Sequence, residues 1–234
     1  MDWIDGKDLF GFVVEKNEIP RSGGRPYAQH TKVELNLVLH TTEGPTVKNA
    51  LNTFAGEPNN ASHFVVGESR IIQLRPLDAQ AGALAVNSPH NPNDGTIQIE
   101  NVGYSKENLW LPEDGLLKPL VALLAFLGAE LQIPLTVPNA WPDDCSDIKT
   151  ILATNNTRRL QAEKTWPAPQ GVWLHMEVPW QAKNWHWDMG RVRRSVILQQ
   201  AEELANQPVN GTSPSGGSDP LSGGDGQMSK PSNI

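Results

Sequence analysis

Two histidines and one aspartate stand where a β-sheet would bring distant parts of the chain together. His40 closes the apolar run "LNLVLH", His175 closes "GVWLH", and Asp188 follows in "NWHWDMG". Two imidazoles and one carboxylate are a common ligand set for catalytic zinc, with a fourth position left for water. Water on zinc ionises near neutral pH and then attacks an amide carbonyl readily. These residues therefore predict a hydrolytic site that holds one zinc ion.

The spacing of the three residues is not diagnostic by itself. A single histidine at the end of a strand is more often a structural residue than a metal ligand. The chain has no HExxH segment, which would place two zinc ligands on one helix. Its one cysteine, Cys145, excludes a Cys-rich zinc site and an internal disulfide framework. The ligands would have to converge from distant segments.

The elements that would position these residues alternate along the chain. Hydrophobic periodicity predicts strands at 34–40, 63–69, 70–76 and 96–103, and helices at 46–56, 116–132 and 191–207. Alternation of this kind is typical of a sheet covered by helices. We therefore expect an α/β fold in one domain, with a central mixed β-sheet flanked by helices and the zinc site at one rim of the sheet.

Two segments depart from this pattern. Residues 133–170 are rich in Pro, Asn, Asp and Thr and are expected to form a long excursion, which in compact domains is often functional. Residues 207–234 are dominated by Gly, Ser and Pro and offer almost no apolar surface to bury. We expect residues 1–206 to form the folded domain and 207–234 to be a disordered tail, or a linker to a further domain.

Composition limits the partners. The formal net charge of −7 and the pI near 5.3 argue against a general affinity for nucleic acid. The most apolar stretch, which begins at Leu116, contains Lys118, Pro119 and Glu130, so membrane insertion is not expected. The segment "MDWIDGKDLFGF" lacks the basic and apolar regions of a secretory signal. We expect a monomer that is made in the cytoplasm.

Four segments resemble a known enzyme family in their order and spacing. They are "LNLVLHTTEG", "ASHFVVGESRIIQL", "TIQIENVG" and "GVWLHMEVP…HWDMG", and the resemblance covers roughly residues 30–190. The family is the type-2 N-acetylmuramoyl-L-alanine amidases, which include phage endolysins and relatives of the peptidoglycan recognition proteins. The resemblance implies that His40, His175 and Asp188 bind zinc and that Glu100 of "QIEN" is the catalytic glutamate. It implies hydrolysis of the amide between N-acetylmuramic acid and the L-alanine of the stem peptide in bacterial peptidoglycan.

His186 occupies a position where many family members have a lysine, two residues before the last ligand. Alternation along an extended segment would aim residues 186 and 188 to the same side, so His186 is a candidate for stabilising the developing oxyanion. Two alternatives stay open. In the first, His186 only packs between Trp185 and Trp187. In the second, His186 replaces Asp188 as the third ligand, since the gap between His175 and Asp188 is longer than in many relatives.

Further residues are candidates for contacts with the substrate. The indoles of Trp185 and Trp187 could stack on sugar rings, and His63 matches a family histidine that serves as a wall or packing residue. Family members often carry an aromatic residue and a histidine before Ala-Gly, where this chain reads "RPLDAQAG". The sequence therefore leaves that wall of the substrate cleft undefined.

Two other functions compete with the amidase hypothesis. The first is a peptidoglycan-binding module without catalysis. The second is a glycoside hydrolase in which Glu100 pairs with Glu43 or Asp94, which would leave both His40 and His175 unexplained. The zinc amidase accounts for all of the singled-out residues. Its expected role is that of a phage endolysin, which reaches the cell wall from the host cytoplasm through a separate membrane pore.

Overall fold

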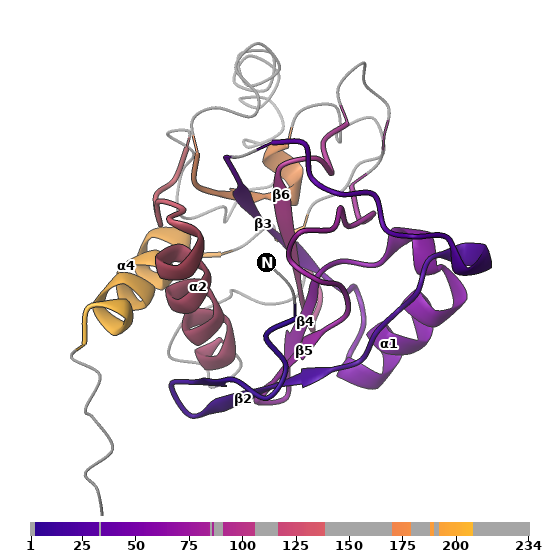
Figure 1. Cartoon of the computed structure of the whole chain (residues 1–234). Coiled ribbons are helices and arrows are strands. Elements are labelled where there is room, and N and C mark those ends of the chain that lie inside the picture. Colours follow the sequence, from indigo (N-terminus) through magenta and orange to yellow (C-terminus); the bar gives the residue numbers. More distant parts are fainter. Residues whose placement is uncertain are drawn as a thin grey trace, which may run out of the picture.

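A mixed β-sheet forms the centre of the structure (Figure 1). The computed structural model describes residues 3–32, 34–84, 86, 91–105, 117–138, 170–178, 188–189 and 192–207. Within these ranges the sheet has seven strands in the order β1-β2-β5-β4-β6-β3-β7. They are β1 (Asp8–Leu9), β2 (Phe12–Lys16), β3 (Asn36–Thr41), β4 (Phe64–Gly67), β5 (Arg70–Gln73), β6 (Thr96–Asn101) and β7 (Val172–Leu174). The pairs β1/β2 and β4/β5 are antiparallel, and the other neighbours are parallel.

Helices cover both faces of this sheet. Figure 1 shows α2 (Lys118–Leu131) and α4 (Arg194–Ala205) side by side on one face and α1 (Val47–Gly56) on the other. The α2/α4 side holds the larger apolar core, to which Leu39 and Ile99 contribute from the sheet. The α1 side holds a smaller core around Phe54. Because side chains alternate along a strand, β4 and β5 serve both layers, with Val66 and Ile71 in the larger core and Val65 and Ile72 in the smaller one.

The helix sequences explain why the two faces of the sheet are covered differently. Helix α1 begins at the cap residue Thr46, whose hydroxyl accepts a hydrogen bond from the backbone N–H of Asn49 at 3.1 Å, and it buries a single stripe that includes Val47 and Phe54. Helix α2 is apolar almost all round, and its residues are buried from Pro119 through Ala125. It therefore lies between the sheet and α4. No described helix has the length and apolar character needed to span a bilayer.

The predicted fold class is confirmed. Each of the strands predicted at 34–40, 63–69, 70–76 and 96–103 contains an observed strand, and the three predicted helices correspond to α1, α2 and α4. The hairpin of β1 and β2 was not predicted; β1 has two residues and lies at the edge of the sheet, and β2 lies between β1 and β5. Residues 139–169 of the expected excursion and residues 208–234 of the expected tail lie outside the described residues.

The register of the parallel strands determines where the site is built. His40 on β3 pairs directly with Glu100 on β6. On its other side, β3 pairs with β7 through Leu39 and Leu174, so that His175 follows beside His40 at the next position. Three chemically active residues from segments far apart in sequence thus meet at the carboxyl ends of adjacent parallel strands. Open α/β sheets commonly bind ligands at this edge.

A buried ion pair attaches α4 to the segment that carries His175. Arg194, the first residue of α4, donates through Nη2 to Glu177 Oε1 at 2.7 Å and through Nη1 to Glu177 Oε2. Its Nη1 also donates to the carbonyl of Val172 at 3.0 Å, and Glu177 Oε2 accepts from the backbone N–H of Leu174 at 2.9 Å. Both charged side chains are almost fully buried. The pair therefore fixes the end of β7 and the 3-10 turn His175–Glu177 against the helix.

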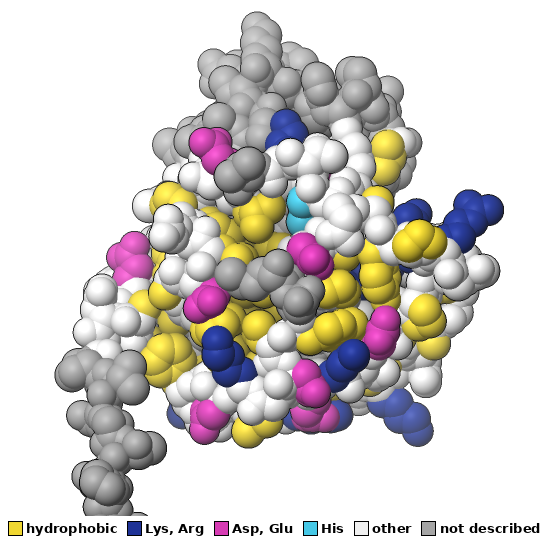
Figure 2. All heavy atoms as spheres, viewed as in Figure 1, with side chains coloured by type: hydrophobic (Ala, Val, Ile, Leu, Met, Phe, Trp, Pro, Cys, Tyr) yellow, Lys and Arg dark blue, Asp and Glu magenta, His cyan; other side chains and the backbone are white. Residues whose placement is uncertain are grey.

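Charged side chains on the outside are mixed in sign. Figure 2 shows acidic and basic side chains interspersed over the viewed face, with apolar side chains between them. Exposed ion pairs join Arg70 to Glu15 at 2.6 Å and Lys16 to Glu18 at 3.3 Å. Because positive and negative side chains are interspersed, this face has no broad region of one charge. Recognition of a charged ligand therefore depends on the charges in local pockets.

We expect Arg194→Met to lower the free energy of unfolding by about 3–5 kcal/mol, because it leaves the buried Glu177 carboxylate without its partner. Urea unfolding would measure this. Adding Glu177→Leu to the same protein should recover most of the loss, since both charges are then gone. The control is Arg70→Met at the exposed pair with Glu15, which should cost less than about 1 kcal/mol. Equal losses at the two arginines would contradict a structural role for the buried pair.

Candidate metal centre and active site

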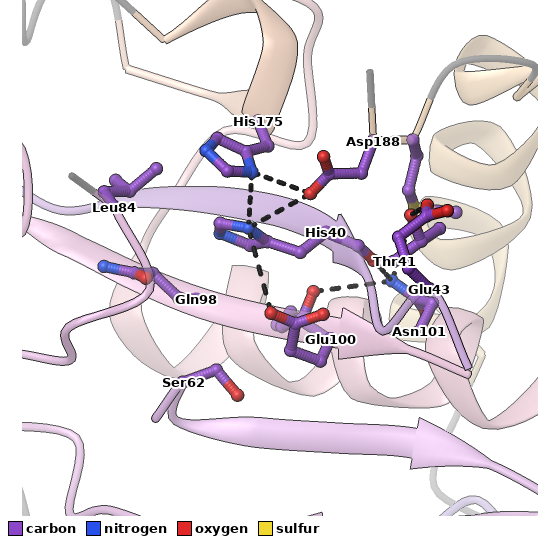
Figure 3. A network of polar contacts seen from close by, with 12 residues as sticks. His40, Thr41, Glu43, Ser62, Leu84, Gln98, Glu100, Asn101, His175 and Asp188 are labelled. Atoms are coloured by element: carbon purple, nitrogen blue, oxygen red, sulfur yellow. Dashed lines mark hydrogen bonds and ion pairs between the residues drawn. The ribbon is translucent and has the colours of Figure 1, made fainter. Parts of the chain in front are cut away.

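Three side chains from β3, from the turn after β7 and from residue 188 converge on one point (Figure 3). His40 Nδ1 lies 3.0 Å from His175 Nδ1. Asp188 Oδ2 lies 2.7 Å from His175 Nδ1 and 3.6 Å from His40 Nδ1. All three side chains are buried. The structure thus brings together the three residues that the sequence singled out as metal ligands.

The two histidines are held by different means. His40 occupies the carboxyl end of β3, where its backbone carbonyl accepts a hydrogen bond from the amide of Asn101 at 3.0 Å. His175 was expected to end a strand, and instead it begins the 3-10 turn that follows β7. This turn is the one fixed by the Glu177–Arg194 pair, so the imidazole of His175 rests on a rigid support.

Asp188 is anchored through its own backbone and through the next residue. Its carbonyl accepts a hydrogen bond from the backbone N–H of Met176 at 3.0 Å. Met189 is fully buried in the core beneath α2 and α4, and its sulfur lies 3.3 Å from the amide nitrogen of Asn101. Asn101 therefore contacts both the strand that carries His40 and the segment that carries Asp188. In the sequence, the only signal for Asn101 is its place directly after Glu100.

The geometry of the three donor atoms fits a zinc ion. A tetrahedral zinc with bonds of 2.0–2.1 Å holds its ligand atoms about 3.3 Å apart, close to the separations between these nitrogen and oxygen atoms. When the proton of each imidazole is on Nε2, both Nδ1 atoms are free of protons, and together with the carboxylate oxygen they lie close enough to bind one ion. Burial alone would raise the pKa of Asp188, but the imidazoles of His175 and His40 hold this pKa well below its usual value. Asp188 is therefore a carboxylate, as a metal ligand must be.

Glu100 lies on the other side of His40 from the His175–Asp188 pair (Figure 3). Its Oε1 is 4.0 Å from His40 Nδ1, too long for a direct hydrogen bond. Its Oε2 is buried and has no hydrogen-bond partner among the described residues. Burial, together with the charges of Asp188 and Glu43, raises the pKa of Glu100 well above the usual value. A carboxylate with these properties can accept a proton from a water molecule beside it.

A cleft of about 340 Å³ opens over this group of residues. Glu100, His175 and Asp188 line it together with Glu43 and Gly82. Glu100 and Gln98 lie on one face of β6, while Ile97 and Ile99 belong to the core on the opposite face, as alternation along the strand predicts. The metal centre and the candidate base therefore face a common space in which a substrate can be placed.

His63 is a packing residue and is out of reach of a substrate. Its side chain is fully buried, and the ring stacks with His30 at 5.9 Å between centroids. The backbone N–H of Gln98 donates to His63 Nδ1 at 3.0 Å, so the ring proton resides on Nε2 and is donated to the carbonyl of Ala79 at 2.7 Å. Both nitrogens are thus used within the fold. This corrects the prediction of a substrate contact and leaves the packing role that the sequence also allowed.

The remaining candidate residues have different outcomes. His186, Trp185 and Trp187 lie outside the described residues, so their predicted roles stay predictions. Asp94 accepts a hydrogen bond from the backbone N–H of Thr31 at 2.7 Å and is not part of the cleft wall. Glu43 does line the cleft, and it accepts hydrogen bonds from Thr41 at 2.7 Å and from the backbone N–H of Ser105 at 2.9 Å.

Comparisons with known proteins concern the family and the fold of the chain. Residues 31–145 match the family model of N-acetylmuramoyl-L-alanine amidase. Over this segment the sequence is similar to that amidase family. The family resemblance found in the sequence is thereby confirmed, and the protein is an enzyme that hydrolyses an amide of peptidoglycan. The matched segment contains His40 and Glu100 and ends before His175 and Asp188.

Several solved structures are similar to this chain, and PlyL and the PlyG catalytic domain are similar enough to support the fold. PlyL is 16% identical, with 82% of this chain and 98% of that chain covered and a TM-score of 0.51. The PlyG catalytic domain is 15% identical, with 86% and 100% covered and a TM-score of 0.50. The Staphylococcus aureus hydrolase AmiA, solved in complex with its ligand, is 14% identical, with 82% of each chain covered and a TM-score of 0.47. No protein with a curated function matches this sequence.

The neutral His63 should make the stability of the amidase depend on pH. Burial, with a smaller contribution from the charge of His30, lowers the pKa of His63 from 6.5 to about 3. At a pH between these two values the unfolded chain binds a proton that the folded chain does not, so stability falls as the pH is lowered. Between about pH 7 and pH 5 the expected loss is about 2 kcal/mol from this group.

Urea unfolding of the wild type and of His63→Gln at both pH values would measure this effect. Glutamine is uncharged and offers one donor and one acceptor. The difference between the two proteins isolates His63, because the other histidines titrate in both. If the variant loses as much stability as the wild type over this range, the folded protein does not hold His63 neutral by lowering its pKa.

Proposed function

We propose that this amidase is a zinc enzyme that cleaves the bond between N-acetylmuramic acid and the L-alanine of the stem peptide. The observation that carries the proposal is the convergence of His40 Nδ1, His175 Nδ1 and Asp188 Oδ2, with the unpartnered carboxylate oxygen of Glu100 beside them. Its similarity to the amidase family supplies the substrate class. Neither line of support depends on the other.

His40, His175 and Asp188 would hold the zinc ion. Zinc in such a position polarises a carbonyl oxygen and makes water more acidic, and it needs no covalent intermediate with the protein. The Glu177–Arg194 pair and the amide of Asn101 would keep the ligands in place. Supporting contacts of this kind typically change metal affinity by about 10–100-fold when they are removed.

Glu100 would act as the general base and then as the general acid. Its Oε2 is directed away from any protein partner among the described residues and can accept a proton from the attacking water. The same carboxyl group would pass the proton to the amine of L-alanine as it leaves. A raised pKa, caused by burial and by Asp188, suits a group that must hold the proton for part of the cycle. His186 remains our candidate for stabilising the oxyanion.

The rival functions account for less of the geometry. A glycoside hydrolase would pair Glu100 with Glu43, since Asp94 is bonded to Thr31 away from the cleft. It gives no reason for two imidazoles and an aspartate to meet at one point. A binding module without catalysis would not require a buried carboxylate with an unpartnered oxygen, because leaving such a group unsatisfied costs stability. Zinc catalysis explains both features.

We expect His175→Ala to lose both bound zinc and wall hydrolysis, because it removes one of three protein ligands. Glu100→Ala should keep zinc and lose turnover by about 10²–10⁴-fold, the usual contribution of general acid–base catalysis. The measurements are zinc content by elemental analysis and release of stem peptides from purified peptidoglycan.

The matched control is Glu43→Gln, a second acidic residue of the same cleft, which should keep zinc and most of the activity. New reducing sugar ends, formed by the wild type and lost in Glu43→Gln, would instead indicate the glycoside hydrolase. A chelator should abolish activity and added zinc should restore it. Full activity of Glu100→Ala would remove this residue from the mechanism.

We further propose that the amidase serves as a phage endolysin that acts on the wall from the cytoplasmic side. The support is the resemblance of the sequence to a family that includes phage endolysins. Such an enzyme would meet its substrate only after a separate pore opens the membrane. Localisation would then control activity without any change in the enzyme itself.

Bacteria with a susceptible wall should survive production of the amidase in their cytoplasm until the inner membrane is permeabilised. Turbidity should then fall within minutes, because the enzyme reaches the wall only at that point. Cells that carry Glu100→Ala provide the control and should remain turbid after the same treatment. Lysis that begins before permeabilisation would contradict the proposed route.

A further inference from the structure

A second cavity, of about 280 Å³, adjoins the metal cleft. The two share Asn60 and Gly82 in their walls. Gly82 makes this close arrangement possible, because a Cβ at this position would lie 1.6 Å from the carbonyl oxygen of Asn59. A substrate bound across the metal centre can therefore extend directly into the second cavity.

Arg75, which follows β5, is the distinctive residue of this second cavity. Its side chain is only 2% exposed. Nη1 donates to the carbonyl of Gln80 at 3.0 Å and Nη2 donates to the carbonyl of Pro58, while Nε is buried without a partner. These bonds use two of the five N–H donors of the guanidinium. The remaining donors are available to an acceptor that the protein itself does not provide.

The surroundings of Arg75 lack a counter-ion. Among the described residues no carboxylate lies within ion-pair distance of its guanidinium, which instead lies 5.4 Å from the ring centre of Tyr27. Arg21 lines the same cavity, and the other polar side chains among its described lining residues are all Asn or Gln. Burial lowers the pKa of Arg75 to about 10, and repulsion from Arg21 contributes to this lowering. A buried cation of this kind normally has a partner.

The charge of the cavity contrasts with that of the chain. The sequence carries a formal net charge of −7, yet this cavity presents two guanidinium groups and no described acidic group. Guanidinium groups bind carboxylates and phosphates through paired hydrogen bonds. A carboxylate is the expected ligand here, because the leaving group of an amidase is a peptide and the cavity opens from the cleft where that peptide is released.

We propose that Arg75 and Arg21 form a subsite that binds a carboxylate of the stem peptide and selects free carboxylates over carboxamides. The inference rests on the proposed function for the identity of the peptide. It makes the two arginines specificity-determining residues and assigns them no part in bond cleavage. Binding of the carboxylate would supply the counter-ion that Arg75 lacks among the described residues.

The test uses two N-acetylmuramoyl peptides of identical sequence, one with free carboxylates and one with every carboxylate converted to a carboxamide. Calorimetry would measure their binding to the zinc-loaded full chain carrying Glu100→Ala, so that no turnover occurs. We expect the free carboxylate form to bind at least tenfold more tightly, the usual effect of a charge-assisted hydrogen bond. Initial rates with the active enzyme should show the same preference in KM and little in kcat.

Arg75→Gln should abolish the preference between the two peptides, and Arg21→Gln should reduce it. The second variant matters because Arg75 also bonds two backbone carbonyls, and its loss could unfold the loops, which thermal unfolding would reveal. Arg70→Gln is the matched control, since it removes an exposed arginine from the nearby β5 and should leave the preference unchanged.

Each outcome separates this inference from the proposed function. Hydrolysis of both peptides with equal affinity would overturn the subsite and leave the amidase intact. Carboxylate-dependent binding without hydrolysis would support the subsite and contradict the proposed reaction. A preference that persists in both arginine variants, or tight binding of inorganic phosphate in place of the peptide carboxylate, would also overturn the subsite.

Discussion

The parallel pairing of β3 with β6 and β7 is the constraint on which the site depends. It places Glu100 opposite His40, and it places His175 one step beyond the last pair that joins β3 to β7. A slip of one residue would turn His40 and Glu100 toward the apolar core, because side chains alternate in direction along a strand. The core residues Leu39 and Ile99 prevent such a slip, since it would move them toward the cleft.

Buried charged side chains are a second feature of the structure, and their surroundings differ in three cases. Glu177 and Arg194 neutralise each other and attach α4 to the turn that carries His175. Asp188 is stabilised by two imidazoles and would be fully compensated by a cation at their shared centre. Arg75 has only carbonyl partners and an aromatic neighbour within the described residues. Unpaired groups in a protein interior are costly, so their persistence beside a cleft indicates ligands.

Much of the fold could be predicted from local patterns, because strand alternation and helix periodicity depend on neighbouring residues only. These patterns located the central strands and the three helices of the described residues, and they placed Glu100 on the face opposite Ile97 and Ile99. The role of His63 could not be predicted in the same way. Its ring is fixed by Gln98 and Ala79, which lie far from it in sequence and adjacent in space.

The available residue types, and the strand face that each would occupy, could be read from local patterns alone. It named His40, His175 and Asp188 as a possible ligand set, and a family resemblance gave that set a reaction. That their donor atoms lie 2.7–3.6 Å apart, and that Arg75 is buried beside the same cleft with no counter-ion among the described residues, follows from the folded structure. These distances result from the packing of segments up to 135 residues apart, which no local pattern encodes.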